Sequence, residues 1–171
     1  MSNSRKRHTE TSKLQIAGLT WNFAPYGLIF TARKFLVACK ATVVQEESEA
    51  RPAEWHPVGK YLACHSIELS LKSILTLKEE TLSGAKGGFS HNLTKLLQEA
   101  STKGLSEIVA LTPEERDQII KASPYYDEKV FEYPSLPEAV RAYPGDPNVY
   151  SLVSAAEKLV DGLYESCRAA A

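Results

Sequence analysis

Three ionisable residues lie close together in a segment that is otherwise apolar: His65, Glu68 and Lys72. On an α-helix, which turns about 100° per residue, they project within an arc of about 60°, and Tyr61 falls in the same arc. Glu68 precedes Lys72 by four residues, the favourable order for an ion pair on a helix. A carboxylate between an imidazole and an ammonium group is suited to proton transfer or anion binding. A purely structural ion-pair network has the same pattern and is the alternative.

His91 is a second candidate because it stands where a glycine-rich loop is expected to enter a helix. The first N–H groups of a helix have no partner within it and attract anions, and Lys86 in the loop would add a positive charge. The loop lacks the Gly-Lys-Ser/Thr ending of a phosphate-binding P-loop. A histidine that caps the helix or lies at the edge of the core is the alternative interpretation.

Metal ligation is a weaker hypothesis. His65 and Glu68 are spaced to share a metal ion, with His91 arriving from the next helix, but no further pair of ligands supports this. The three cysteines are widely spaced and include no Cys-x-x-Cys pair. We therefore expect neither a metal nor a cofactor.

The spacing of apolar residues predicts five helices that position these groups. They extend from Pro25 to Gln45, from Pro57 to Lys78, from Ser90 or Asn92 to Gly104, from Thr112 to just before Ser123, and from Asp146 to Cys167. The second is apolar around most of its circumference, as expected of a central helix. No run shows sustained strand alternation. The expected fold is all-α, an up-and-down helical bundle with a proline- and tyrosine-rich irregular segment before the last helix.

Composition narrows the class of protein. The chain has 171 residues with a net charge of −1, which argues against binding of duplex nucleic acid by bulk electrostatics. No apolar run approaches the roughly 20 residues that span a bilayer, and the start lacks the apolar stretch of a secretory signal. Together with the odd number of cysteines in the chain, the lack of such segments favours a cytoplasmic protein. Residues 1–13 are expected to form a flexible basic tail, and residues 14–171 a single domain.

Two segments carry a resemblance to a known family. The run from Tyr61 to Leu75 contains His-Ser-Ile-Glu-Leu-Ser-Leu-Lys, and the run from Ser90 to Leu97 reads Ser-His-Asn-Leu-Thr-Lys-Leu-Leu. Together they resemble the HEPN superfamily. The resemblance implies a helical bundle that commonly forms a homodimer in prokaryotic stress, defence and toxin–antitoxin settings. Some members cut RNA, some partner nucleotidyltransferases and some bind nucleotides.

The resemblance carries over four ligand-binding candidates, which are His65, Glu68, Lys72 and His91. Ribonuclease members of the family share an Arg followed within a few residues by a His near the last helix. Here Arg141 is followed by no such histidine, since no histidine occurs after His91.

The leading hypothesis is therefore a binding or regulatory module near nucleotide or RNA metabolism, without catalysis. The alternative is a metal-independent ribonuclease using Arg51 and His56, which have four residues between them in a proline-bounded loop. A third hypothesis is a structural partner protein in which the ionisable groups only fix the register of the helices.

Overall fold

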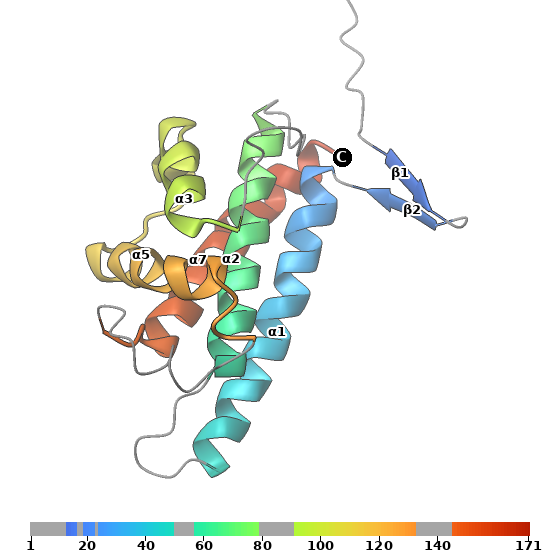
Figure 1. The fold of residues 1–171 in the computed structure, drawn as a ribbon. Coiled ribbons are helices and arrows are strands. Elements are labelled where there is room, and N and C mark those ends of the chain that lie inside the picture. Colours follow the sequence, from blue (N-terminus) through green and yellow to red (C-terminus); the bar gives the residue numbers. More distant parts are fainter. Residues whose placement is uncertain (1–12, 17–18, 23, 50–56, 79–90, 133–144) are drawn as a thin grey trace, which may run out of the picture.

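The chain forms an all-α helical bundle, as the sequence predicts (Figure 1). The computed structural model describes residues 13–16, 19–22, 24–49, 57–78, 91–132 and 145–171. Its helices are α1 (Pro25–Glu49), α2 (Pro57–Leu77), α3 (Leu93–Thr102), α4 (Leu105–Ile108), α5 (Pro113–Asp127) and α7 (Val149–Ala169). None of the helices in this described part is long and apolar enough to cross a membrane.

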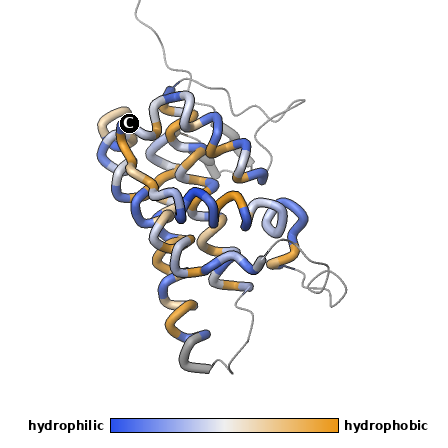
Figure 2. The backbone as a smooth tube through the Cα atoms, turned by 90° about the vertical axis from the view of Figure 1, so that its left-hand side faces the viewer, coloured by the Kyte–Doolittle hydropathy of each residue, from blue (hydrophilic) through white to orange (hydrophobic). Residues whose placement is uncertain are grey.

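The central position expected for the second helix is confirmed. α2 contacts α1, α3, α5 and α7; α1 lies on one side of it, α3 and α5 lie on the other, and α7 crosses behind it (Figure 1). Its side chains Ile67, Leu71 and Ile74 are fully buried, and burying each contributes about 1.5–3 kcal/mol. Hydrophobic and hydrophilic residues alternate along the helices (Figure 2). The ionisable residues of α2 are therefore held on a rigid helix within the core.

Small residues bring α1 and α2 close together. The Ser66 hydroxyl donates to the carbonyl of Ala32 on α1 at 2.9 Å, and the Cys39 thiol donates to the carbonyl of Gly59 on α2 at 3.2 Å. A Cβ atom added at Gly59 would lie 2.9 Å from Cγ2 of Val43. Such short approaches fix the position of α2 relative to α1.

α5 begins at the cap that the sequence predicts, and it carries a buried carboxylate, that of Glu115. Glu115 accepts from the backbone N–H of Thr112 at 2.7 Å, and its own N–H donates to the Thr112 hydroxyl at 3.2 Å, forming a capping box. It also accepts hydrogen bonds from Ser154 and Lys158 on α7. Burial raises the pKa of Glu115, but the bonds from Lys158, Thr112 and Ser154 outweigh this and lower it to about 2.

The prediction that this helix ends before Ser123 is wrong. α5 continues through Pro124 to Asp127. Proline lacks an N–H and removes one hydrogen bond from the helix. The turn around Pro124 buries the side chains of Tyr125 and Tyr126, and this burial compensates for the lost bond.

Two short strands that were not predicted from the sequence precede the bundle. β1 (Lys13–Ile16) and β2 (Leu19–Asn22) form an antiparallel pair in which Leu14 is opposite Trp21 and Ile16 is opposite Leu19. The alternation lasts only four residues in each strand, which is too short to stand out in the sequence. Apart from Lys13, the expected basic tail lies outside the described residues.

The last helix starts slightly later than predicted. Asn148 is its N-cap and accepts from the backbone N–H of Ser151 at 3.0 Å. Residues 133–144 of the proline- and tyrosine-rich segment lie outside the described residues. Within the described part, Phe131 stacks on Tyr125 with ring centroids 5.4 Å apart, as expected for aromatic residues that pack on the bundle.

Candidate functional site

The site is built around the carboxylate of Glu68, whose side chain is only 2% exposed. Its Oε1 accepts a hydrogen bond from the ammonium group of Lys72. Its Oε2 lies 2.5 Å from the hydroxyl of Tyr126 and 3.1 Å from Nδ1 of His91. Nδ1 of His65 lies 2.6 Å from the same tyrosine hydroxyl. We call these five residues the Glu68 cluster.

The cluster joins three parts of the chain. His65, Glu68 and Lys72 come from successive turns of α2, as their spacing predicts. His91 lies just before the N-cap of α3, and Tyr126 lies in the last turn of α5. The fold therefore brings together all four ligand-binding candidates of the sequence analysis.

The hydrogen bonds fix where the protons lie on the two histidine rings. A tyrosine hydroxyl has one proton, and Tyr126 gives it to Glu68. The short contact to His65 must then be a bond in which Nδ1–H of His65 donates to the tyrosine oxygen. A carboxylate only accepts, so His91 likewise donates from Nδ1. In each neutral ring the lone pair is therefore on Nε2.

The carboxylate is held in its ionised form. Burial by itself would raise the pKa of Glu68, but the interactions with His65, Lys72 and Tyr126 outweigh it and hold the pKa well below its ordinary value. Burial and the negative charge of Glu68 together raise the pKa of Tyr126, so its hydroxyl keeps its proton. The result is a hydrogen-bonded chain from His65 through Tyr126 and Glu68 to His91.

Exposure differs sharply among the members of the cluster. The side chain of His91 is 57% exposed, that of His65 is 24% exposed and that of Lys72 is 19% exposed. The negative charge is buried, whereas the imidazole and ammonium groups reach the surface. A ligand that approaches here meets hydrogen-bond donors, a cation and two nitrogen lone pairs.

Aromatic rings surround His65. Phe35 of α1 contacts it edge-on, with ring centroids 4.3 Å apart, and Tyr61 of α2 lies nearly parallel to it at 5.9 Å. Tyr61 also contacts Tyr126 at 5.8 Å. These rings are partly exposed or buried beside the cluster, so a planar aromatic ligand would find further rings next to the polar groups.

The sequence suggested an anion site at the start of α3, but hydrogen bonds within the protein occupy N–H groups there. The side chain of Asn92 accepts from the N–H of Lys95 at 3.0 Å, and the hydroxyl of Ser123 accepts from the N–H of Thr94 at 3.2 Å. These N–H groups are satisfied within the protein. His91 belongs to the site through its bond to Glu68 instead. Lys86 lies outside the described residues.

Tyr126 is the member of the cluster that sequence reasoning missed. It stands 58 residues from Glu68, and no spacing rule relates the two positions. The only signal is indirect, because the large apolar rings of the tyrosines that follow Pro124 favour packing on the bundle. Arg51 and His56, the residues of the ribonuclease alternative, lie outside the described residues.

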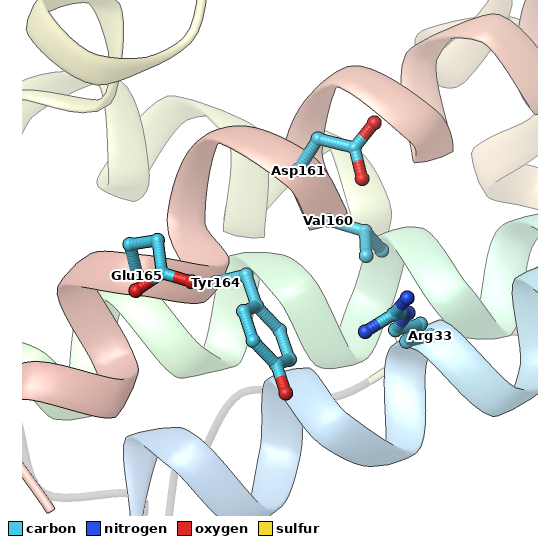
Figure 3. Close-up of a pocket in the computed structure, with 5 residues that line it drawn as sticks. All are labelled: Arg33, Val160, Asp161, Tyr164 and Glu165. Atoms are coloured by element: carbon cyan, nitrogen blue, oxygen red, sulfur yellow. The ribbon is translucent and has the colours of Figure 1, made fainter.

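A separate open pocket lies between α1 and α7 (Figure 3). Its volume is about 260 Å³, and it is lined by Arg33, Val160, Asp161, Tyr164 and Glu165. The guanidinium carbon of Arg33 lies 5.3 Å from the ring centre of Tyr164. No residue of the Glu68 cluster lines this pocket, so it is a distinct surface feature.

Metal binding finds no support in the described part of the chain, where no three His, Cys, Asp or Glu residues are grouped to hold an ion. The three cysteines are buried there as free thiols. Comparison with protein-family models, curated proteins and solved structures finds no match to the chain.

Proposed function

We propose that this chain is a HEPN-like, cytoplasmic, homodimeric module that binds the phosphate of a nucleotide or of RNA at the Glu68 cluster and does not itself catalyse a reaction. The sequence resemblance in the runs that contain His65 and His91 supports the family. That family links the proposal to prokaryotic stress, defence or toxin–antitoxin systems. An RNA or a nucleotidyltransferase is the partner that it implies.

The observation that carries the proposal is the arrangement of charges around Glu68. The carboxylate is buried and neutralises Lys72, while His91 and His65 keep their Nδ1 protons directed at the cluster. Each ring then offers Nε2 outward from its bond within the protein.

A phosphate group matches this arrangement. Its oxygens accept hydrogen bonds from the remaining Nζ protons of Lys72, and the hydroxyl of a singly protonated phosphate donates to the Nε2 lone pair of a histidine. The alternative is a purely structural network, in which removal of these side chains changes only the free energy of unfolding. Ligand binding distinguishes the two, since a structural network predicts none.

The aromatic rings favour a nucleotide over phosphate alone. Phe35 and Tyr61 lie against His65 beside the charged groups. Stacking of a base on such rings contributes about 1–3 kcal/mol. A nucleotide would thus gain binding free energy both from its phosphate at the Glu68 cluster and from stacking of its base on these rings.

Calorimetric titration tests the proposal with ATP, AMP and inorganic phosphate as probes. We expect AMP to bind, and His91→Ala or Lys72→Ala to weaken it at least about tenfold, because a hydrogen bond to a charged group is worth about 1.5–3 kcal/mol. Lys121→Ala is the matched control, since Lys121 pairs with Asp117 on the surface of α5. Absence of heat with every probe would refute nucleotide binding and favour the structural alternative.

A second candidate function is metal-independent cleavage of RNA. The sequence-based alternative places this activity on Arg51 and His56, and the imidazoles of His65 and His91 likewise have the chemistry of a general base or a general acid. The test is incubation of the purified protein with RNA, compared with His65→Ala and His56→Ala. Degradation that either substitution abolishes would replace the non-catalytic proposal with this one.

A further inference from the structure

His91 is the most exposed member of the Glu68 cluster and carries a nitrogen nucleophile. Its side chain is 57% exposed, whereas that of Glu68, which it contacts, is only 2% exposed. The bond of 3.1 Å from Nδ1–H to Oε2 of Glu68 turns Nδ1 toward the protein. The lone pair of the ring is then on Nε2, which is directed away from this bond. A defined nucleophilic nitrogen therefore lies on a ring that is more than half exposed.

The carboxylate partner makes this nitrogen more reactive. A carboxylate that accepts from one ring N–H fixes the tautomer and the orientation of the imidazole, and it raises the basicity of the other nitrogen. It also stabilises the positive charge that the ring gains when that nitrogen forms a new bond. Glu68 keeps its own bonds from Lys72 and Tyr126 while it contacts His91. It is therefore a fixed counter-charge for His91.

His65 lacks this arrangement, although it belongs to the same cluster. Its Nδ1 donates to the neutral hydroxyl of Tyr126 at 2.6 Å and lies farther, at 3.6 Å, from Oε2 of Glu68. A neutral oxygen stabilises a positive ring less than a carboxylate does. The side chain of His65 is also only 24% exposed and has aromatic rings beside it. The geometry therefore distinguishes His91 from His65.

We propose that Nε2 of His91 is a phosphoryl-acceptor site, which takes a phosphoryl group from a phosphoramidate donor to give Nε2-phosphohistidine. The lone pair of Nε2 attacks phosphorus and forms the new P–N bond. The P–N bond of the donor breaks, and the leaving nitrogen, already protonated, departs with the bonding electron pair as a neutral amine. Nδ1 keeps its proton, so the ring becomes an imidazolium that faces the charge of Glu68. The proposal rests on phosphate binding at the Glu68 cluster and adds a covalent step to it.

Lys72 supplies the positive charge that such a transfer requires. Its ammonium group bonds to Oε1 of Glu68, whereas His91 bonds to Oε2 of the same carboxylate. Two Nζ protons of Lys72 remain for the oxygens of a phosphate. Cations that contact a transferring phosphoryl group stabilise the charge on its oxygens in the transition state. The nucleophile and the cation are thus held by one buried carboxylate.

The bond that forms indicates the class of donor. Hydrolysis of a P–N bond to imidazole releases a large free energy, so the donor must transfer its phosphoryl group at least as readily. A donor whose phosphorus is itself bonded to nitrogen exchanges one P–N bond for another, and the transfer therefore costs little free energy. A phosphoramidate is for this reason the expected donor, and ATP, a phosphoric anhydride, is the comparison.

The test is incubation of the full chain with potassium phosphoramidate, followed by phosphorus NMR and peptide mass spectrometry in alkali, where phosphohistidine is stable. We expect His91 to be labelled first, as the Nε2 isomer. His91→Gln should lower the initial rate at least about tenfold, because the nucleophile is removed. This variant is expected to fold, since the His91 side chain is exposed. His8→Gln is the matched control and should leave the rate unchanged, because His8 is a histidine of the expected basic tail.

Glu68→Gln tests the role of the carboxylate as a positioning residue. An amide has no negative charge to stabilise the imidazolium, so labelling of His91 should slow by about 10–100-fold, with the fold checked by circular dichroism. If this variant does not fold, the isomer formed in the unmodified chain decides instead. Only a ring whose Nδ1 is held by the protein gives the Nε2 isomer alone.

Three results would overturn the proposal: labelling that persists at the same rate in His91→Gln, the Nδ1 isomer at His91, or labelling by ATP but not by phosphoramidate. Calorimetric titration with AMP is a separate measurement. Binding of AMP without labelling of His91 would reject the acceptor site and retain the proposed function. Labelling of His91 at Nε2 without heat from AMP would retain the acceptor site and reject the nucleotide as its ligand.

Discussion

Tyr126 donates its hydroxyl proton to Oε2 of Glu68 across 2.5 Å, although the two residues lie 58 positions apart in the chain. This bond connects the last turn of α5 to the middle of α2. It also determines the proton on His65, because the tyrosine oxygen can only accept from Nδ1 of that ring. This hydroxyl therefore both connects α5 to α2 and determines which nitrogen of His65 carries the proton.

Removal of this hydroxyl should be costly. Tyr126→Phe leaves the ring in place but deprives Glu68 and His65 of a buried partner, so we expect a loss of about 1–3 kcal/mol in the free energy of unfolding. Urea denaturation followed by circular dichroism measures it. Tyr125→Phe is the control, since the Tyr125 hydroxyl makes a longer bond of 3.3 Å, to the carbonyl of Gly145. A loss in Tyr126→Phe no larger than in this control would contradict the assigned role.

The lowered pKa of Glu68 predicts a specific loss of stability in acid. Above about 4.5, the ordinary value for a glutamate, the carboxylate is ionised in both states and its stabilisation is fully present. As the pH falls below that value, the unfolded state takes up the proton first, so stability decreases toward the lower pKa of the folded state. Glu115 contributes in the same direction, down to its pKa of about 2.

Denaturant titrations between neutral pH and pH 3 check this prediction. Glu68→Gln should flatten the dependence of the free energy of unfolding on pH below about 4.5, because the amide does not titrate. Glu99→Gln, at an exposed position of α3, serves as the control. Parallel curves for Glu68→Gln and the unmodified chain would show that the carboxylate is not held in its ionised form.

Much of this site could be predicted from the sequence because its main determinants are local. The spacing of His65, Glu68 and Lys72 on a helix fixes their common face through helical geometry alone. His91 was identifiable from its place at a helix start. Its bond to Glu68, and the participation of Tyr126, depend on how α3 and α5 pack against α2, which no local rule provides.

The same distinction explains the errors in the fold. The proline rule placed the end of α5 before Pro124, but burial of Tyr125 and Tyr126 extends the helix past it. The free energy gained by burying these two side chains outweighs the local preference of proline to end a helix. The hairpin of β1 and β2 was missed for a different reason, since four residues per strand are too few to establish a period.

The cysteines should be unreactive in the folded protein. Burial raises the pKa of all three thiols, that of Cys39 to about 12, and the thiolate is the reactive form. We expect no reaction with a chromogenic disulfide reagent at mildly alkaline pH, and reaction of all three thiols in concentrated guanidinium chloride. Rapid labelling of the native protein would show that the core opens.

Gly162 of α7 provides a test of packing in which two effects oppose each other. Alanine in the interior of a helix is normally more stable than glycine by about 0.5–1 kcal/mol. At this position, however, an added Cβ would lie 2.7 Å from Cγ2 of Val109 and 3.4 Å from the carbonyl oxygen of Ile108. Val109 is itself buried, so it has little room to move. We therefore expect Gly162→Ala to destabilise the protein, since overpacking a core costs about 1–3 kcal/mol.

A double-mutant cycle isolates the cause. Val109→Ala alone should destabilise the protein by creating a cavity, but it removes the atom that the new Cβ would meet. In that background Gly162→Ala should become neutral or stabilising, because the methyl group partly refills the space and the helical preference for alanine is no longer opposed. If Gly162→Ala were equally destabilising with and without Val109, the close approach of α7 to this valine would not be what requires a glycine.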